Sequence, residues 1–220
     1  PRYADYVCDV EGLLKFAQEE FDEAVATWGD CVAEYPSDLS TRLLLVAATG
    51  HGGLGADARA QRARIDAAIT AGGRPAFSVL SAYADFPLQQ AADAERLRDG
   101  FRRAGVPELP FGYDTTSLAR LTRDEVEKLL FGHRARARNL DSGEACVWNH
   151  AVDGAPVAKC GKVTDTGSIP TFDGDVACYW WTGTGPSCVA YFRNPDGTSA
   201  DGNEFLAITP VDRWAFSIDG

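Results

Sequence analysis

Histidines are the side chains best suited to acid–base chemistry near neutral pH, and the chain has three: His51, His133 and His150. Serine-hydrolase chemistry also needs a nucleophile held beside a base, and the sequence contains no G-x-S-x-G motif. His133 and His150 lie in strand-like segments, where a histidine is usually a surface or core side chain. We therefore expect no enzymatic activity and no cofactor. A hydrolase using His150 with Asp153 is the least favoured alternative.

Six cysteines could supply zinc ligands or disulfides, but neither C-x-x-C nor H-E-x-x-H occurs. A four-cysteine site from the last four is weighed, but their wide spacings suit staples across hairpins better. We expect three local pairs: Cys8 with Cys31, Cys146 with Cys160, and Cys178 with Cys188. Paired cysteines would place this portion outside the cytoplasm, in the periplasm or secreted, whereas six thiols would indicate a reducing cytoplasm.

Oxygen ligands gather in residues 194–204, a loop rich in Asn, Asp and Gly. Their spacing does not match an EF-hand, and a long hairpin turn requires the same residue types. An ordinary loop is therefore favoured over a calcium site, and no metal is expected.

Three arginines alternate with alanines in residues 133–138, so Arg134, Arg136 and Arg138 share one face of a strand. One interpretation is a row that binds an anionic ligand. The favoured interpretation is a solvated edge strand whose charges discourage edge pairing and meet internal carboxylates.

A hairpin over residues 178–193 organises the second half of the chain, with its turn near Gly183. Alternation places the two cysteines on one face with Trp180, Ala190 and Phe192. The opposite face carries Tyr179, Trp181, Val189, Tyr191 and Arg193. Because an antiparallel sheet needs only one face for its core, the second face must be covered or offered to a partner. Tyr179, Trp181, Tyr191 and Arg193 are therefore the candidate binding surface, although at least two of the three aromatics are expected in the core.

Two amphipathic helices are predicted at residues 6–18 and 21–34, followed by a degenerate second unit at 39–69. The first unit resembles a tetratricopeptide repeat through its residues Gly12, Phe21, Ala24, Trp28 and Pro36. Residues 50–55 satisfy G-x-G-x-x-G, but they follow a helix and no βαβ pattern surrounds them, so a loop between helices is preferred to a dinucleotide site.

A further resemblance begins after the second unit, in Asp85-Phe86-Pro87, Glu95-Arg96-Leu97 and residues 100–108. These stretches resemble the terminal helix and tail that follow tetratricopeptide repeats in bacterial class III adenylate/guanylate cyclase polypeptides. Residues 129–132, 166–167, 192–195 and 203–206 look like the β-rich tail found behind such repeats. The likeness covers an accessory region and no cyclase catalytic domain. It implies that the chain is a fragment of a longer signalling polypeptide, which the lack of methionine also suits.

The second half opens with a capping box, Thr122 with Glu125, and a staple of Leu121 against Val126. About eight short alternating strands follow, separated by turn residues. We therefore predict an α+β protein with tetratricopeptide-like helical hairpins in residues 1–112 and an antiparallel β-barrel or sandwich in 113–220. Two hairpins are few for a stable repeat array, so the helical part is expected to lean on another element or subunit.

The charge of −11 and pI near 4.7 argue against a nucleic-acid or anionic-membrane surface, and no apolar run is long enough to span a membrane. The favoured function is a non-enzymatic interaction or sensory module with a protein or peptide partner, and self-association is left open. The alternative is a small-molecule-binding β-barrel with a helical docking arm. A deep apolar cavity inside the barrel would favour the alternative.

Overall fold

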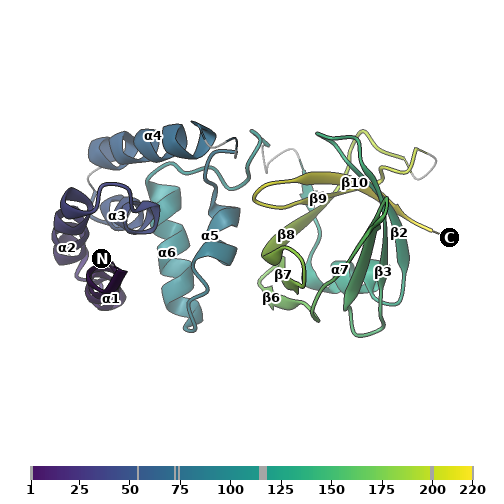
Figure 1. The fold of residues 1–220 in the computed structure, drawn as a ribbon, viewed down its shortest axis with the longest axis horizontal. Helices are drawn as coiled ribbons and strands as arrows, with labels where there is room; N and C mark the ends of the chain where they lie inside the picture. The colour runs from purple at the N-terminus through teal and green to yellow at the C-terminus, as the bar shows by residue number, and fades with distance from the viewer. Residues whose placement is uncertain are drawn as a thin grey trace. The chain divides into compact units, whose positions relative to one another are not determined.

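The computed structural model describes residues 2–53, 55–71, 73, 75–113, 118–198 and 201–219. The chain divides into two compact units (Figure 1). The first comprises Pro1–Val79 and Phe86–Pro107, and the second comprises Leu80–Asp85 and Glu108–Gly220. The first unit is helical and the second is built on an antiparallel sheet, which confirms the α+β class. Residues 80–85, which the sequence placed in the helical domain, pack with the sheet instead.

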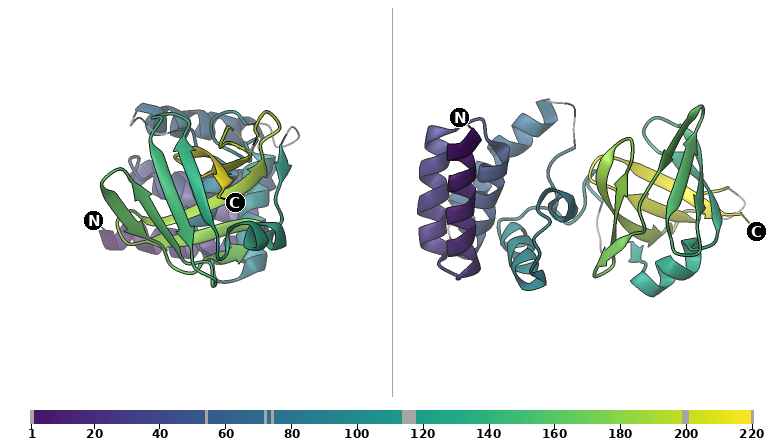
Figure 2. Two further views of the ribbon diagram at one scale, coloured as in Figure 1. Left: turned by 90° about the vertical axis from the view of Figure 1, so that its right-hand side faces the viewer. Right: turned by 60° about the horizontal axis from the view of Figure 1, so that its bottom comes forward.

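The helical unit contains α1 (Arg2–Ala17), α2 (Phe21–Glu34), α3 (Leu39–His51), α4 (Gly55–Ala71) and α6 (Ala91–Arg103). Helix α1 lies beside α2, α2 lies beside α3, and α3 contacts both α4 and α6 (Figure 2). In the described part of the chain, every helix is too short or too polar to cross a lipid bilayer.

The contact between α1 and α2 depends on a small residue facing a large one. Trp28 is fully buried, and a side chain at Gly12 would overlap its indole ring. The two helices are also joined by the Cys8–Cys31 disulfide, with Cα atoms 6.1 Å apart. The turn between them passes through Glu19 in the left-handed region, at φ 64°. This explains why the chain reverses tightly there.

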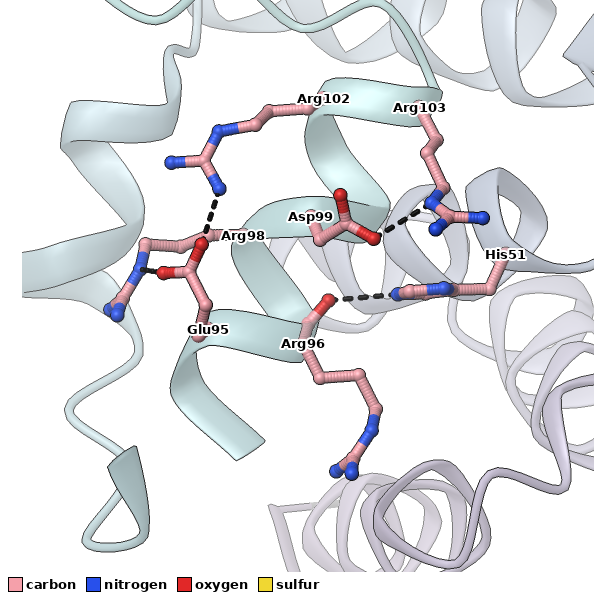
Figure 3. Close-up of polar contacts among 7 residues, drawn as sticks. All are labelled: His51, Glu95, Arg96, Arg98, Asp99, Arg102 and Arg103. Atoms are coloured by element: carbon pink, nitrogen blue, oxygen red, sulfur yellow. Dashed lines mark hydrogen bonds and ion pairs between the residues drawn. The ribbon is translucent and has the colours of Figure 1, made fainter. Parts of the chain in front are cut away.

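Helices α3 and α6 also approach closely, through glycines. A Cβ atom on Gly50 would overlap the Gly100 carbonyl, and one on Gly100 would overlap the Ala47 carbonyl. At the same crossing the His51 Nε2 donates to the Arg96 carbonyl oxygen over 2.8 Å (Figure 3). The glycines before residue 54 therefore serve a helix contact and the end of α3 rather than a phosphate cradle. Leu54, in the same motif, lies outside the described residues.

The second unit adds α5 (Val79–Asp85) and α7 (Arg123–Leu130) to ten strands. The strands are β1 (Ala119–Arg120), β2 (Arg134–Asn139), β3 (Ala145–His150), β4 (Pro156–Cys160), β5 (Val163–Thr166), β6 (Thr171–Asp173), β7 (Val176–Trp181), β8 (Gly185–Arg193), β9 (Phe205–Ile208) and β10 (Arg213–Ile218). They form one sheet in the order β5-β4-β3-β2-β10-β9-β8-β7-β6, with β1 paired to β8.

The sheet curls on itself to form a half-barrel. The chain just after β5 meets the end of β7, where Gly167 bridges Trp181 and the Thr182 N–H donates to the Thr166 carbonyl over 2.9 Å. A single curled sheet accounts for all the described strands, so the half-barrel, and not the sandwich, is the architecture present. At the end where β2 begins and β3 ends, α7 lies across the opening (Figure 1).

The two faces of the sheet carry separate apolar clusters. On the concave side, Tyr179 and Tyr191 belong to a core completed by Val126 and Leu130 of α7. On the convex side of β7–β10, Phe192 and its neighbours pack against Leu80 of α5 and the segment that follows residue 107. The face of the hairpin around Phe192 is therefore covered by α5 and the segment after residue 107, and the second face, with Tyr179, Trp181 and Tyr191, lies on the concave side.

Two local predictions for this unit are confirmed. Thr122 and Glu125 form the capping box of α7, with the Thr122 N–H donating to the Glu125 carboxylate over 2.9 Å. In the hairpin, Cys178 stands opposite Cys188 and Trp181 opposite Gly185, so the turn is centred where expected.

All three cysteine pairs are disulfides. Cys146–Cys160 joins β3 to β4, and Cys178–Cys188 joins β7 to β8, with Cα atoms 4.3 and 4.0 Å apart. Every cysteine of the chain is thus paired. No thiol is left for the four-cysteine zinc site, since a zinc ligand must be a free thiolate.

Candidate functional site

A cavity of about 500 Å³ occupies the concave side of the half-barrel, entirely within the second unit. It is lined from β3, β4, β5, β7, β8, β9 and β10 and from the turns between them. The aromatic lining residues are Trp148, Tyr179, Trp181, Tyr191 and Trp214, and the ionisable ones are Glu144, His150, Asp165 and Asp212. Clefts that bind small ligands have this volume and this mixture of apolar wall with a few polar groups.

The exposure of the lining residues defines a mouth and a deep end. Glu144, Thr184 and Val211 are exposed and lie in turns at the end where β2 and β9 finish. His150 and Tyr191 are buried and lie towards the end covered by α7. The cavity therefore runs along the half-barrel from an open rim to a closed floor.

The walls between rim and floor are indole rings held by other aromatics. Trp148 meets Trp214 edge-on, with ring centroids 5.6 Å apart, and also contacts Phe216. Across the cavity Trp181 lies against Tyr179, with centroids 5.9 Å apart. The three tryptophans are only partly buried although each is packed on one side. Each tryptophan therefore leaves part of its ring surface available to a ligand in the cavity.

Two tyrosines form the polar part of the floor. The hydroxyls of Tyr179 and Tyr191 are 3.2 Å apart and share a hydrogen bond. Burial raises the pKa of Tyr179 to about 12 and raises the pKa of Tyr191 well above its ordinary value. Both phenols therefore stay neutral at physiological pH and can donate or accept hydrogen bonds.

His150 is the other polar group at the deep end. Its side chain is 8% exposed, and its Nδ1 has no hydrogen-bond partner among the described residues. Burial lowers the pKa of His150 to about 4, so the imidazole is neutral at physiological pH. Asp153 does not pair with it: that carboxylate accepts from the Ala155 N–H in the exposed β3–β4 turn. The arrangement expected for a His150–Asp153 hydrolase is not formed.

Three carboxylates lie nearer the rim. Asp165 Oδ1 accepts the N–H groups of Thr166 and Gly183 at 2.8 and 2.9 Å, so it fastens β5 to the β7–β8 turn. Asp212 Oδ1 accepts from the Asn139 side-chain amide at 3.1 Å. Within the described part of the chain, none of the carboxylates of Glu144, Asp165 and Asp212 forms an ion pair with a basic side chain.

Three of the four residues of the candidate binding surface on the hairpin line the cavity, and the fourth does not. Tyr179, Trp181 and Tyr191 all line the cavity. Arg193 does not line it: its guanidinium pairs with Glu125 of the capping box at 3.3 Å and lies 5.8 Å from the ring centre of Phe205. Arg193 is on the same face of β8 but near α7, where the floor is closed. It therefore stabilises the unit outside the cavity.

The arginine row is on the convex face of β2, as the alternation predicts. Arg134 and Arg136 both pair with Asp219, at 3.2 and 2.5 Å, and Arg138 is exposed. The expectation of an edge strand is wrong, because β2 lies between β10 and β3. The order of the strands along the sequence does not show this, because β10, the last strand of the chain, pairs with β2.

The calcium candidate at residues 194–204 lies partly outside the described residues, which exclude Ser199 and Ala200. Its described oxygens serve the turn: the Asn194 side-chain amide donates to the Asn203 carbonyl over 2.7 Å, and the Thr198 hydroxyl donates to Asp201 over 2.6 Å. These bonds are those of an ordinary long hairpin loop.

Sequence reasoning did not identify Trp148, Trp214, Asp165 or Asp212 as site residues. The alternation carried a signal for Trp148, because Trp148 and His150 lie on the same face of β3 as Cys146, which pairs with Cys160 on β4. What the pattern lacked was the curl that brings β3 and β5 opposite β7 and β8.

Comparison of the chain with protein-family models, curated proteins and solved structures gives no match. Its function is therefore inferred from the cavity.

Proposed function

We propose that the half-barrel binds a small organic ligand in its cavity without transforming it. The observation that supports this most is the cavity itself, about 500 Å³ in volume and walled by five aromatic side chains. A small barrel with a filled interior would instead have favoured the interaction module.

The polar groups of the cavity suit binding better than bond-making. A nucleophile needs a base within hydrogen-bond reach, yet the His150 Nδ1 has no partner among the described residues. The two tyrosine hydroxyls bond to each other, and the raised pKa values of both phenols make them poor nucleophiles. These groups can position a ligand by hydrogen bonds.

A pair of neighbouring tryptophans provides the test. Trp181 lines the cavity, whereas Trp180 points to the other face and is 65% exposed. A neutral apolar fluorophore, N-phenyl-1-naphthylamine, should brighten on binding the protein. Trp181→Ala should weaken that binding about tenfold or more, since tryptophans in pockets contribute most to affinity, and Trp180→Ala should leave it unchanged. Equal effects of the two substitutions, or no brightening, would contradict the proposal.

A second function for the helical unit is supported by α1. Val7, Val10 and Leu14 are 47%, 47% and 59% exposed and fall on one helix face. The unit resembles tetratricopeptide hairpins, which bury such faces against neighbouring hairpins. We propose that the stripe pairs with the same stripe of a second copy, because a two-fold interface uses one patch twice.

Light scattering over a concentration series tests this pairing. The double substitution Val10→Lys with Leu14→Lys should abolish dimerisation, and the control Glu23→Lys, on the exposed part of α2, should not. A wild-type protein that stays monomeric at every concentration would exclude the interface.

Three disulfides support an oxidising location, so we propose that the chain functions outside the cytoplasm. The likeness of residues 85–108 to a cyclase accessory region is kept as part of this proposal: the half-barrel would then be the sensory module of a signalling polypeptide. Reporter fusions that need an oxidising compartment for activity would test the location.

A further inference from the structure

Among the described residues, the charge of the cavity lining is entirely of one sign. Glu144, Asp165 and Asp212 contribute carboxylates, and the described lining contains neither Lys nor Arg. The Oδ2 atoms of the two aspartates make no hydrogen bond with the described residues, because each aspartate accepts its partners through Oδ1. The free oxygens leave the rim strongly negative in a protein that already carries a net charge of −11.

The aromatic walls also favour a positively charged ligand. The face of an indole is the most attractive of the aromatic faces for a cation, at distances up to about 6 Å from the ring centre. Trp148, Trp181 and Trp214 line the path between the rim and the floor, and all three are partly exposed to the cavity. An anion would meet the carboxylates and the negative ring faces without any compensating base.

His150, at the deep end, does not oppose a positively charged ligand. Its Nδ1 is buried and has no hydrogen-bond partner among the described residues. The imidazole is neutral at physiological pH because burial lowers the His150 pKa to about 4. It therefore adds no positive charge that would oppose a cation.

We infer that the ligand of the half-barrel is an organic cation, with an apolar body between the tryptophans and an amine or quaternary ammonium group near Asp165 and Asp212. This inference rests on the proposed binding function and specifies the class of ligand. A neutral ligand that uses only the aromatic walls is the competing outcome.

A matched series of three probes separates these outcomes by calorimetry at pH 7.5 and low salt. The probes are 2-naphthylmethylammonium, 2-naphthylmethanol and 2-naphthoate, which share the ring system and differ in charge. We expect the ammonium probe to bind about tenfold more tightly than the alcohol, the naphthoate to bind more weakly than either, and only the ammonium affinity to fall steeply with added salt.

Isosteric neutral variants locate the charge. Asp165→Asn and Asp212→Asn keep an oxygen to accept the existing hydrogen bonds, so both should fold. Each should weaken the ammonium probe about threefold to tenfold and leave the alcohol unchanged. Asp153→Asn is the matched control, since that carboxylate lies in the β3–β4 turn outside the cavity lining. Glu144→Gln, at the exposed rim, provides a third variant if either aspartate change lowers the melting temperature.

Equal affinity for the ammonium and alcohol probes, or cavity variants that behave like Asp153→Asn, would contradict the inference that the ligand is a cation. The proposal that the cavity binds a ligand would remain. Failure of all three probes and of the neutral fluorophore to bind would overturn both proposals.

Discussion

Replacing His150 tests the deep end of the cavity through the pH dependence of stability. Burial lowers the pKa of the folded imidazole to about 4, and an unfolded histidine has a pKa of about 6.5. Between these values the unfolded chain binds more protons than the folded protein, so stability must rise with pH across this window. Acidification should therefore destabilise the wild type by about 2 kcal/mol between pH 7.5 and pH 5 and by about 3 kcal/mol at pH 4.

Urea denaturation of the wild type, His150→Leu and His150→Gln at pH 7.5, 6 and 5 measures this contribution. All other titratable groups are common to the three proteins, so the difference in slope isolates the imidazole. Both variants should lack the loss of about 2 kcal/mol at pH 5. At pH 7.5, His150→Leu should be at least as stable as the wild type, because it removes a buried nitrogen that has no partner. Parallel loss of stability in all three proteins would show that the imidazole titrates as if in water and would refute the assignment.

Three further predictions concern the framework. Gly100→Val should cost several kcal/mol, because its side chain would overlap the Ala47 carbonyl on α3; a lowered urea midpoint checks this. Thr122→Ala should cost about 1 kcal/mol through loss of the capping box of α7, and a thermal melt would measure it. Alkylation of the native protein without reductant should modify no cysteine by intact mass, and modification of all six would refute the disulfides.

Local features of this fold could be predicted from sequence because each is set by neighbouring residues. The hairpin register follows from the turn near Gly183, and it places Cys178 opposite Cys188. The capping box follows from Thr122 and Glu125 three positions apart. Outward alternation of Arg134, Arg136 and Arg138 follows from the two-residue period of a strand.

Long-range placement could not be predicted in the same way. Nothing local in residues 80–85 distinguishes a helix that packs on a sheet from one that packs on other helices, since both require an apolar face. The position of β2 depends on β10, about 80 residues later in the chain, so its interior place in the sheet is invisible to local pattern. Arg193, which was predicted on the same strand face as Tyr191, lies outside the cavity for a related reason, because a strand face extends beyond the cavity that it partly lines.

The hairpin of β7 and β8 shows why the cavity exists at all. The part of its convex face around Phe192 is buried by α5 and the segment after residue 107, and this fixes the hairpin to the rest of the unit without using the concave face. On the concave face, α7 fills only the end around Val126 and Leu130. The sheet curls far enough for Gly167 to meet Trp181, but no helix of the described part of the chain lines the open end. The aromatic side chains there are held from behind by core contacts and remain uncovered in front, which is the arrangement that a preformed binding site requires.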